Sequence, residues 1–219
     1  VLIKEYNNLK NLPISPKKDN FLYNIHFVEG AFCEIRGADD TKFRIEFIDK
    51  KTNKHLHFHD ISNNMWTRTN AKYFIDYLIK VKNKDTDEVI HECEYNAKGK
   101  RVMICFDSKA IGDTLAWFPY VEEFRKKHQC EVIVSTFHNE WFKGNYPNLE
   151  FIEPGDTAYN LYARYDVGWY YNEADYEENN TINLNQIPTD FRKGPLGKTC
   201  SDILGLDYKE IKPKLTFKN

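Results

Sequence analysis

The sequence has little net charge and no long apolar run. Its 31 basic and 33 acidic residues leave a formal net charge of −2 over 219 residues, and no long block of one sign stands out. The composition therefore gives no reason to expect nucleic acid or an anionic membrane surface as a partner. No stretch approaches the ~18 consecutive apolar residues of a membrane-spanning helix, and the start of the chain lacks the basic-then-apolar layout of a secretory signal. We expect a protein that inserts into no membrane and works in the cytoplasm.

Paired cysteines and nucleotide-binding glycine motifs are also missing. The five cysteines lie far apart and form no C-x-x-C pair, so neither a zinc finger nor a disulfide framework is predicted, and reduced thiols fit a cytoplasmic protein best. The patterns G-x-G-x-x-G and G-x-x-x-x-G-K are both absent, which gives little support to a dinucleotide fold or a phosphate-loop ATPase.

What the sequence does have, from about residue 20 to residue 95, is an alternation of apolar and polar residues. At 42–47 the apolar residues alternate with charged ones, as expected for a strand with one face on a core and the other in water. The runs at 21–28 and 73–81 are similar but more apolar, and polar turn signals separate the runs. With almost no helical period, this region is predicted to be a small antiparallel β-domain.

The pattern changes after a short polar stretch at 96–100. Residues 102–106 form a continuous apolar run, which is typical of a strand buried on both faces in a parallel sheet. From residue 113 to residue 128 the apolar positions follow a helical spacing. Further strands are predicted at 131–135, 148–152 and 166–170. A strand, a loop, a helix and a strand in this order make a βαβ unit, so a Rossmann-like parallel sheet is predicted.

The predicted organisation is an α/β protein with a small β-domain in front. The polar segment 1–19, which contains Pro13 and Pro16, is assigned as an arm or linker. Residues 20–96 form the β-rich domain and 97–219 the Rossmann-like domain. Aromatic residues make up 15% of the chain. They are assigned mainly to cores, although large rings are also common on oligomer-forming surfaces, so a homo-oligomer stays open.

The best candidates for chemistry lie in the loop after the first strand of the βαβ unit, because ligands bind beyond the carboxyl ends of strands in open parallel sheets. Gly112 would allow close backbone approach or an unusual φ. Asp113 stands where a helix presents unpaired N–H groups and a positive dipole end. An ionised carboxylate there can accept a proton from an attacking hydroxyl. The alternative is that Asp113 or Thr114 merely caps the helix.

Other residues carry weaker signals. Ser108 and Lys109 can touch an anionic or hydroxylated ligand from the same loop, but a solvated loop explains them equally well. Trp117, Trp169 and Tyr170 can line a cleft, although helical spacing and strand position favour core packing.

The alternating histidines His55, His57 and His59 would share one face of a strand, a geometry that can hold a metal. No acidic or cysteine ligand accompanies them at a recognisable spacing. One polar face of a strand is therefore the favoured interpretation.

The run FDSKAIGDTLAWFPYVEEFRKKHQCEVIVS resembles the start of the Rossmann-like acceptor domain of the bacterial autotransporter heptosyltransferases. These enzymes modify Ser and Thr of autotransporter adhesins with heptose from ADP-heptose. The segments NYPNLEFI, ARYDVGWYY and IPTDFRKGPLGKTCSDILGLDYKEIKP agree with that family in order and at similar intervals. The preceding β-rich region is similar to the small N-terminal β-domain of the family. The resemblance covers residues 20–215.

The resemblance implies a GT-B glycosyltransferase whose catalytic aspartate falls on Asp113. The substrate-binding candidates beside it, from their place in the loop and at the helix start, are Ser108, Lys109, Gly112 and Thr114. Arg192 matches a further family segment and would reach the donor phosphates, for which a guanidinium fork is suited. A surface ion pair with an acid such as Asp190 is the alternative for Arg192.

The implied donor is ADP-heptose and the implied acceptor is the passenger protein of an autotransporter. The family's iron-binding cysteine cluster lies in the donor-binding half, which the resemblance places beyond Asn219. No metal or other cofactor is therefore expected in this chain. Two other functions stay open: a non-catalytic module for acceptor binding or assembly, and a GT-B transferase for a cell-surface polysaccharide.

Overall fold

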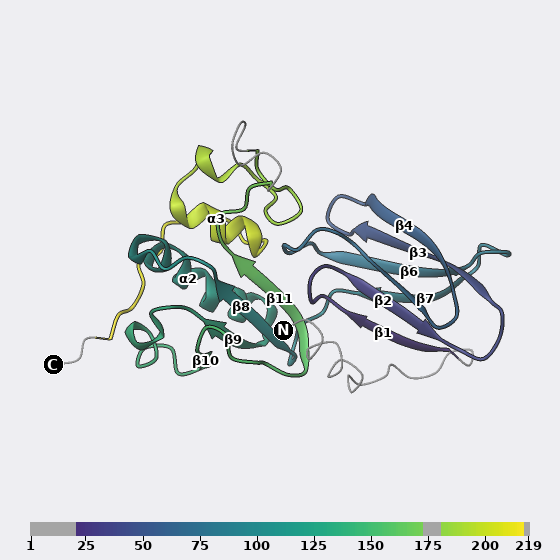
Figure 1. Ribbon diagram of the computed structural model, residues 1–219, viewed down its shortest axis with the longest axis horizontal. Helices are drawn as coiled ribbons and strands as arrows, with labels where there is room; N and C mark the ends of the chain where they lie inside the picture. Colours follow the sequence, from purple (N-terminus) through teal and green to yellow (C-terminus); the bar gives the residue numbers. More distant parts are fainter. Residues whose placement is uncertain (1–20, 173–180, 217–219) are drawn as a thin grey trace. The chain divides into compact units, whose positions relative to one another are not determined.

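The structure is a computed structural model that describes residues 21–172 and 181–216 (Figure 1). The predicted arm at 1–19 lies outside the described residues. The described chain divides into two compact units, one formed by 21–70 and Ile75–Asn96, the other by Ala71–Phe74, 97–172 and 181–216. Antiparallel sheets and a parallel sheet are both present, so the predicted mixture of α and β structure is confirmed. No helix in the described ranges is long and apolar enough to cross a membrane.

The first unit contains two antiparallel sheets, in the orders β1-β2-β5 and β4-β3-β6-β7. The strands of the first sheet are β1 (Leu22–His26), β2 (Phe32–Arg36) and β5 (Met65–Arg68). Those of the second are β3 (Lys42–Asp49), β4 (Lys54–Ser62), β6 (Tyr77–Asn83) and β7 (Val89–Glu94). In β3 the alternation has its expected cause, because Phe43, Ile45 and Phe47 are fully buried. The intervening Arg44 pairs with Asp60 at the surface.

The predicted strand at 73–81 is wrong at its start. The strand β6 begins only at Tyr77, and Ala71–Phe74 belongs to the second unit. There the Phe74 N–H donates to the Ile203 carbonyl oxygen at 2.8 Å, and the Phe74 ring packs against Phe124. Local alternation does not reveal that this apolar residue packs on a core formed much later in the chain.

The second unit contains a sheet of order β10-β9-β8-β11 in which every pairing is parallel. Its strands are β8 (Arg101–Phe106), β9 (Glu131–Ser135), β10 (Leu149–Ile152) and β11 (Leu161–Val167). The helices are α2 (Ile111–His128) and α3 (Leu196–Ile203), with short 3₁₀ turns η2 (Asn139–Trp141) and η4 (Phe191–Lys193). In Figure 1, α2 and α3 lie side by side against the sheet. The predicted parallel sheet is confirmed.

The fourth strand of this sheet was predicted in the wrong place. It spans Leu161–Val167 instead of 166–170, so it ends before Trp169 and Tyr170. The misplacement has a physical cause: Arg164 and Asp166 interrupt the apolar pattern, yet their side chains pair with each other at 2.9 Å. A strand can carry two charges when they neutralise one another.

Two imidazoles inside the units are expected to make stability depend on pH. Burial, with a smaller effect of Arg68, lowers the pKa of His26 to about 4. Burial, with a smaller effect of Lys127, lowers the pKa of His128 to about 4. The unfolded chain binds these protons more tightly than the folded chain does. The contribution of the two neutral histidines to the free energy of unfolding is therefore fully present above a pH of ~6.5 and is lost as the pH falls toward ~4. Each histidine is expected to lower the free energy of unfolding by up to ~1.4 kcal/mol per pH unit in that window.

Urea unfolding at about pH 7 and about pH 5 measures this loss. The variants His26→Gln and His128→Gln should each show a smaller loss than the parent. His55→Gln is the matched control, because His55 is exposed. An equal pH dependence in all four proteins would contradict the expectation.

Candidate active site

Two loops meet at the carboxyl edge of the parallel sheet, one after β8 and one after β11. The strands are parallel neighbours, and their last residues, Phe106 and Val167, are partners in the ladder. The Asp107 N–H then donates to the Val167 carbonyl oxygen at 2.9 Å. Residues 107–110 therefore face residues 168–170, at the edge where α/β sheets bind ligands.

Asp113 is the third residue of α2, and its side chain is 8% exposed. Its Oδ2 accepts two hydrogen bonds, from the Ser108 hydroxyl at 2.6 Å and from the Trp169 indole N–H at 2.8 Å. No hydrogen bond from the described part of the chain reaches Oδ1. One oxygen of the carboxylate is thus anchored, and the other is available to accept a proton.

The hypothesis that Asp113 or Thr114 merely caps the helix is wrong. The N-cap of α2 is Ala110, and no side chain makes a capping hydrogen bond there. Thr114 is fully buried, and its hydroxyl donates to the Ala110 carbonyl oxygen at 3.2 Å. The positive end of the helix dipole lies beside the Asp113 carboxylate, where it favours negative charge.

Gly112 is not explained by the needs of the fold. Its φ is outside the left-handed region, so an unusual φ is not the reason for a glycine here. A Cβ added to Gly112 would meet nothing nearer than Leu196 Cδ1, at 4.0 Å. Space for the close approach of a ligand remains the explanation predicted from the sequence.

Lys109, in the loop after β8, contacts two residues that follow β9, Phe137 and His138. Its Nζ lies 5.1 Å from the centre of the Phe137 ring, a cation–π contact. Its carbonyl oxygen lies 3.0 Å from His138 Nε2. Lys109 and Phe137 are both exposed, and Lys109 makes no ion pair with a described residue. The cation is therefore open to an anionic ligand at this edge.

The loop after β11 is held by contacts that the sequence did not reveal. The Tyr170 hydroxyl donates to Asp107 Oδ2 at 2.5 Å, and burial, together with the Asp107 charge, raises the pKa of Tyr170 well above its usual value. A side chain at Gly168 would be crowded, because a Cβ would come within 3.1 Å of both the Tyr170 ring and Asp107. The expectation that Trp169 and Tyr170 lie on a strand is wrong. A glycine directly before two aromatic residues was the turn signal that could have shown it.

Arg192 lies in η4 and is occupied by an acid. Its guanidinium binds both carboxylate oxygens of Asp190, at 2.8 and 2.9 Å, and these hydrogen bonds hold the pKa of Asp190 below its usual range. The ion pair that the sequence left open as an alternative is therefore present. A contact between Arg192 and a donor phosphate stays a prediction.

Comparison with known proteins adds a second line of evidence. No protein-family model matches the chain. The autotransporter heptosyltransferase BAHTCr of Citrobacter rodentium is 28% identical over 209 residues, which cover 94% of this chain and 47% of the relative. The autotransporter heptosyltransferase TibC of Escherichia coli is 28% identical over 206 residues, covering 93% and 47%. This chain is related to the autotransporter heptosyltransferases. The family resemblance seen in the sequence is thereby confirmed.

A crystal structure of TibC, an iron-containing dodecameric glycosyltransferase of enterotoxigenic E. coli, matches the fold with a TM-score of 0.77 and 25% identity. The match covers 94% of this chain and 51% of TibC. TibC has also been crystallised in complex with ADP-D-β-D-heptose. The inactive autotransporter heptosyltransferase BimC of Burkholderia thailandensis is 27% identical over 132 residues, covering 59% of this chain and 30% of BimC. The chain spans about half the length of BAHTCr and TibC.

The described residues form no cluster that could hold an iron ion. Within 21–172 and 181–216, no three side chains of His, Cys, Asp or Glu come together as metal ligands. Burial raises the pKa of the Cys130 thiol to about 11 and that of Cys200 well above its usual value, which disfavours the thiolate form that binds metals.

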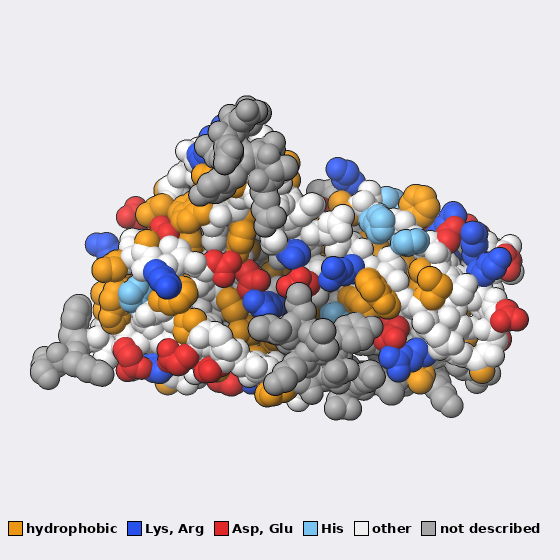
Figure 2. All heavy atoms as spheres, in the orientation of Figure 1, with side chains coloured by type: hydrophobic (Ala, Val, Ile, Leu, Met, Phe, Trp, Pro, Cys, Tyr) orange, Lys and Arg blue, Asp and Glu red, His pale blue; other side chains and the backbone are white. Residues whose placement is uncertain are grey.

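The three histidines of β4 do not share a face. The ladder between β3 and β4 shifts between His55 and His57, so that His57 pairs with Phe47 and His55 with Ile48, on opposite faces. In Figure 2, His side chains gather over β4 among hydrophobic and charged ones. The predicted common face is wrong because a bulge at Leu56 interrupts the alternation.

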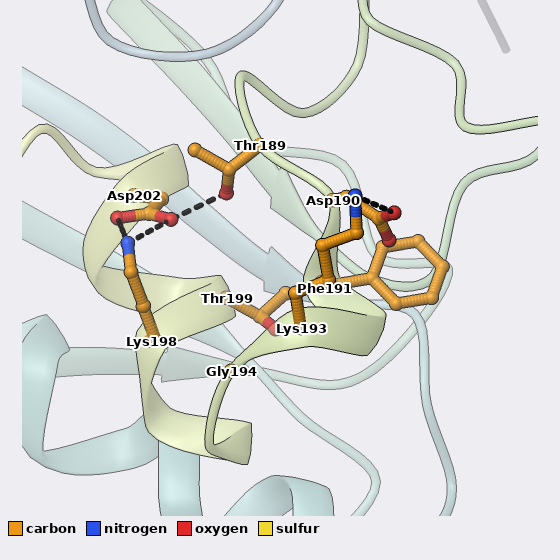
Figure 3. Close-up of a pocket in the computed structure, with 8 residues that line it drawn as sticks. All are labelled: Thr189, Asp190, Phe191, Lys193, Gly194, Lys198, Thr199 and Asp202. Carbon is orange, nitrogen blue, oxygen red and sulfur yellow. Dashed lines mark hydrogen bonds and ion pairs between the residues drawn. The ribbon is translucent and has the colours of Figure 1, made fainter.

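A hollow of about 360 Å³ lies between η4 and the first turns of α3 (Figure 3). Its charged walls are paired internally. Lys198 and the Thr189 hydroxyl both bind the Asp202 carboxylate, and Lys193 lies 3.5 Å from Asp190. Because acids and bases balance, the hollow offers no net charge that would select an ionic ligand.

Proposed function

We propose that this chain is the acceptor-side part of a GT-B glycosyltransferase that transfers heptose from ADP-heptose to Ser or Thr hydroxyls of an autotransporter adhesin. Asp113 acts as the general base. The observation that carries the proposal is the Asp113 carboxylate, which is held at the carboxyl edge of the parallel sheet with one oxygen anchored and the other unpartnered within the described chain. The heptosyltransferase relatives and the TibC complex with ADP-heptose support the choice of sugar and donor.

The proposed reaction is a direct displacement. The acceptor hydroxyl oxygen forms a bond to the anomeric carbon of heptose, and its proton passes to Asp113 Oδ1. The bond between the anomeric carbon and the diphosphate oxygen breaks, and ADP leaves with that electron pair. Removing the proton as the new bond forms avoids a cationic oxygen in the transition state.

Five further residues have proposed roles in this reaction. Lys109 faces the negative charge that develops on the leaving diphosphate, and Gly112 lets the substrate approach the backbone. Ser108 acts through Asp113. Thr114 is buried against Ala110, so its proposed part is to support the loop. Arg192 would have to release Asp190 before it could bind the donor. Lys109 is therefore the preferred candidate for contact with the phosphates, and Arg192 the second.

We assign residues 20–96 as the β-domain and 97–219 as the Rossmann-like half of the GT-B body, with the donor bound by a second domain. TibC is a dodecamer, and on that basis we propose that this protein also forms a homo-oligomer. None of the five cysteines forms a disulfide, which supports a cytoplasmic reaction, before the adhesin is exported.

A non-catalytic module is the second candidate. The observation in its favour is that BimC, an inactive heptosyltransferase, is also a relative. Such a module would bind the passenger protein and release no nucleotide.

Nucleotide release distinguishes the two candidates. The natural gene product that carries these 219 residues is incubated with ADP-heptose, ADP-glucose or UDP-glucose, with and without a passenger fragment. We expect ADP to accumulate only with ADP-heptose and passenger together. Binding of the passenger without release of nucleotide from any donor would instead support the module. In a parallel incubation, a cell-surface polysaccharide replaces the passenger, and release of nucleotide only there would assign a polysaccharide transferase.

Gly112→Ala is expected to impair the reaction without harming the fold. Alanine is favoured over glycine inside helices, so the free energy of unfolding should stay unchanged or rise by up to ~1 kcal/mol. The added methyl group would meet the incoming substrate, and kcat/KM should fall by roughly 10-fold or more, which corresponds to a loss of ~1.4 kcal/mol of transition-state binding. Kinetics and urea unfolding of the same preparations measure both effects.

Gly197→Ala is the matched control, because Gly197 is the second residue of α3 just as Gly112 is the second residue of α2. A Cβ on Gly197 would come within 3.1 Å of the Tyr120 hydroxyl and 3.3 Å of the Ala116 carbonyl oxygen. This variant should lose ~1–3 kcal/mol of stability through overpacking. If Gly112→Ala lost stability in the same way, or kept full activity, the role given to Gly112 would be wrong.

A further inference from the structure

Two successive side chains of the loop after β11 tie it to the loop after β8 and to the first turn of α2. Trp169 donates to Asp113 Oδ2 at 2.8 Å, and Tyr170 donates to Asp107 Oδ2 at 2.5 Å. Each tie joins an aromatic donor to a carboxylate. Only the first of them reaches the proposed base.

The directions of the hydrogen bonds around Asp113 are fixed by the chemistry of the donors. The Ala110 N–H donates to Ser108 Oγ at 3.1 Å, so the hydroxyl proton of Ser108 is free to point to Asp113 Oδ2, 2.6 Å away. The Trp169 indole N–H can only donate. Oδ2 therefore accepts two hydrogen bonds, one from Ser108 and one from Trp169.

The indole of Trp169 is itself held in place. Its ring centre lies 5.3 Å from that of Trp117, which is fully buried in α2, and 4.7 Å from that of Phe191 in η4. Neighbouring rings on two sides restrict its rotation. A donor fixed in this way can fix its acceptor.

We propose that Trp169, together with Ser108, is a positioning residue that holds Asp113 Oδ2, so that Oδ1 is the oxygen that takes the proton of the acceptor hydroxyl. This inference rests on the proposed function of Asp113 as base. A terminal carboxylate torsion is broad and soft when nothing holds it. Two donors on one oxygen set the plane of the carboxylate and keep the other oxygen oriented before substrate arrives.

Kinetics test the positioning role. Trp169→Phe keeps an aromatic ring against Trp117 and Phe191 but removes the N–H donor. We expect kcat to fall roughly 10- to 100-fold, the range that a small misplacement of a catalytic group costs, with KM for both substrates nearly unchanged. Ser108→Ala should act in the same direction, and Ser108→Thr, which keeps the hydroxyl, should restore most of the rate.

Tyr170→Phe is the matched control. It removes one donor from the adjacent residue of the same loop and leaves the bonds to Asp113 in place. The split between a lowered kcat and an unchanged KM should appear in Trp169→Phe and be absent from Tyr170→Phe. Equal losses in the two variants would show that the loop acts only as structure, and would overturn the proposal.

A spectroscopic measurement tests the contact without any activity. The chain has 4 Trp residues, so the amide-proton spectrum of the ¹⁵N-labelled chain contains an indole signal for each, and Trp169→Phe identifies that of Trp169. In Asp113→Asn a charge-assisted hydrogen bond becomes a weaker neutral one. The Trp169 signal should move more than the others, whereas that of Trp117, whose N–H donates to the Leu196 carbonyl oxygen at 2.9 Å, should stay as an internal reference.

The two measurements separate failure of this inference from failure of the proposed function. If Asp113→Asn leaves the Trp169 signal in place, or if Trp169→Phe keeps the parental kcat while Asp113→Asn is inactive, the positioning role is wrong and the base remains. If Asp113→Asn keeps full transfer activity, the proposed base is wrong, and the positioning role falls with it.

Discussion

Replacing Asp113 with Asn is expected to slow the chemical step of heptose transfer by about 10²- to 10⁴-fold, the usual contribution of a general base. The substitution keeps the shape of the side chain and an oxygen that can accept from Trp169, but it removes the charge that takes the proton. Binding of ADP-heptose should change little, because the proton moves only in the transition state. Single-turnover transfer with saturating donor isolates the chemical step.

Asp166→Asn is the control for the loss of one negative charge in the same unit. Asp166 lies in β11 and pairs with Arg164 at 2.9 Å, and no role in the reaction is given to it. Its variant should transfer heptose at close to the parental rate, whereas equal losses in Asp113→Asn and Asp166→Asn would point to a general effect of charge on the fold.

The largest expected effect on stability comes from Trp117. Its side chain is fully buried in α2, its indole N–H donates to the Leu196 carbonyl oxygen at 2.9 Å, and its own carbonyl oxygen lies 3.4 Å from the Cys200 thiol. Trp117→Ala would leave a large cavity and remove the hydrogen bond that ties α2 to the start of α3. We expect the free energy of unfolding of the second unit to fall by about 3–5 kcal/mol.

Urea unfolding followed by circular dichroism measures this loss. Trp66→Ala is the matched control, because Trp66 is 47% exposed in the first unit, and a partly exposed ring contributes less when it is removed. A comparable loss in the two variants would contradict the view that Trp117 joins the two helices.

Where the sequence predicted the fold correctly, local patterns reported burial. In β3 the buried Phe43, Ile45 and Phe47 alternate with charged residues, and in β8 every residue after Arg101 is buried. Alternation indicates a strand with one buried face, as in an antiparallel sheet, and a continuous apolar run indicates a strand buried on both faces, as in a parallel sheet. The position of Asp113 followed for the same reason, because the loop after β8 had to open at the carboxyl edge of that sheet.

The errors share a different cause. The strand β11 was misplaced because the charged Arg164 and Asp166 interrupt its apolar pattern, and the sequence does not show that the two side chains neutralise each other. The apolar start of the run at 73–81 packs on residues such as Phe124, far away in the sequence. The bond between Trp169 and Asp113 joins residues 56 positions apart. Contacts of this kind depend on the strand order, which no local alternation contains.

The most direct test of the account is the intact mass of an autotransporter passenger fragment after incubation with ADP-heptose and the natural gene product that carries this chain, as the parental protein and as Asp113→Asn. The account predicts mass increments of one heptosyl group, on Ser or Thr, with the parental protein. With Asp113→Asn it predicts almost no such increments, although this variant should unfold at the same urea concentration as the parental protein. Increments at the same rate in both would contradict the role of Asp113, and no increment in either would contradict the transferase.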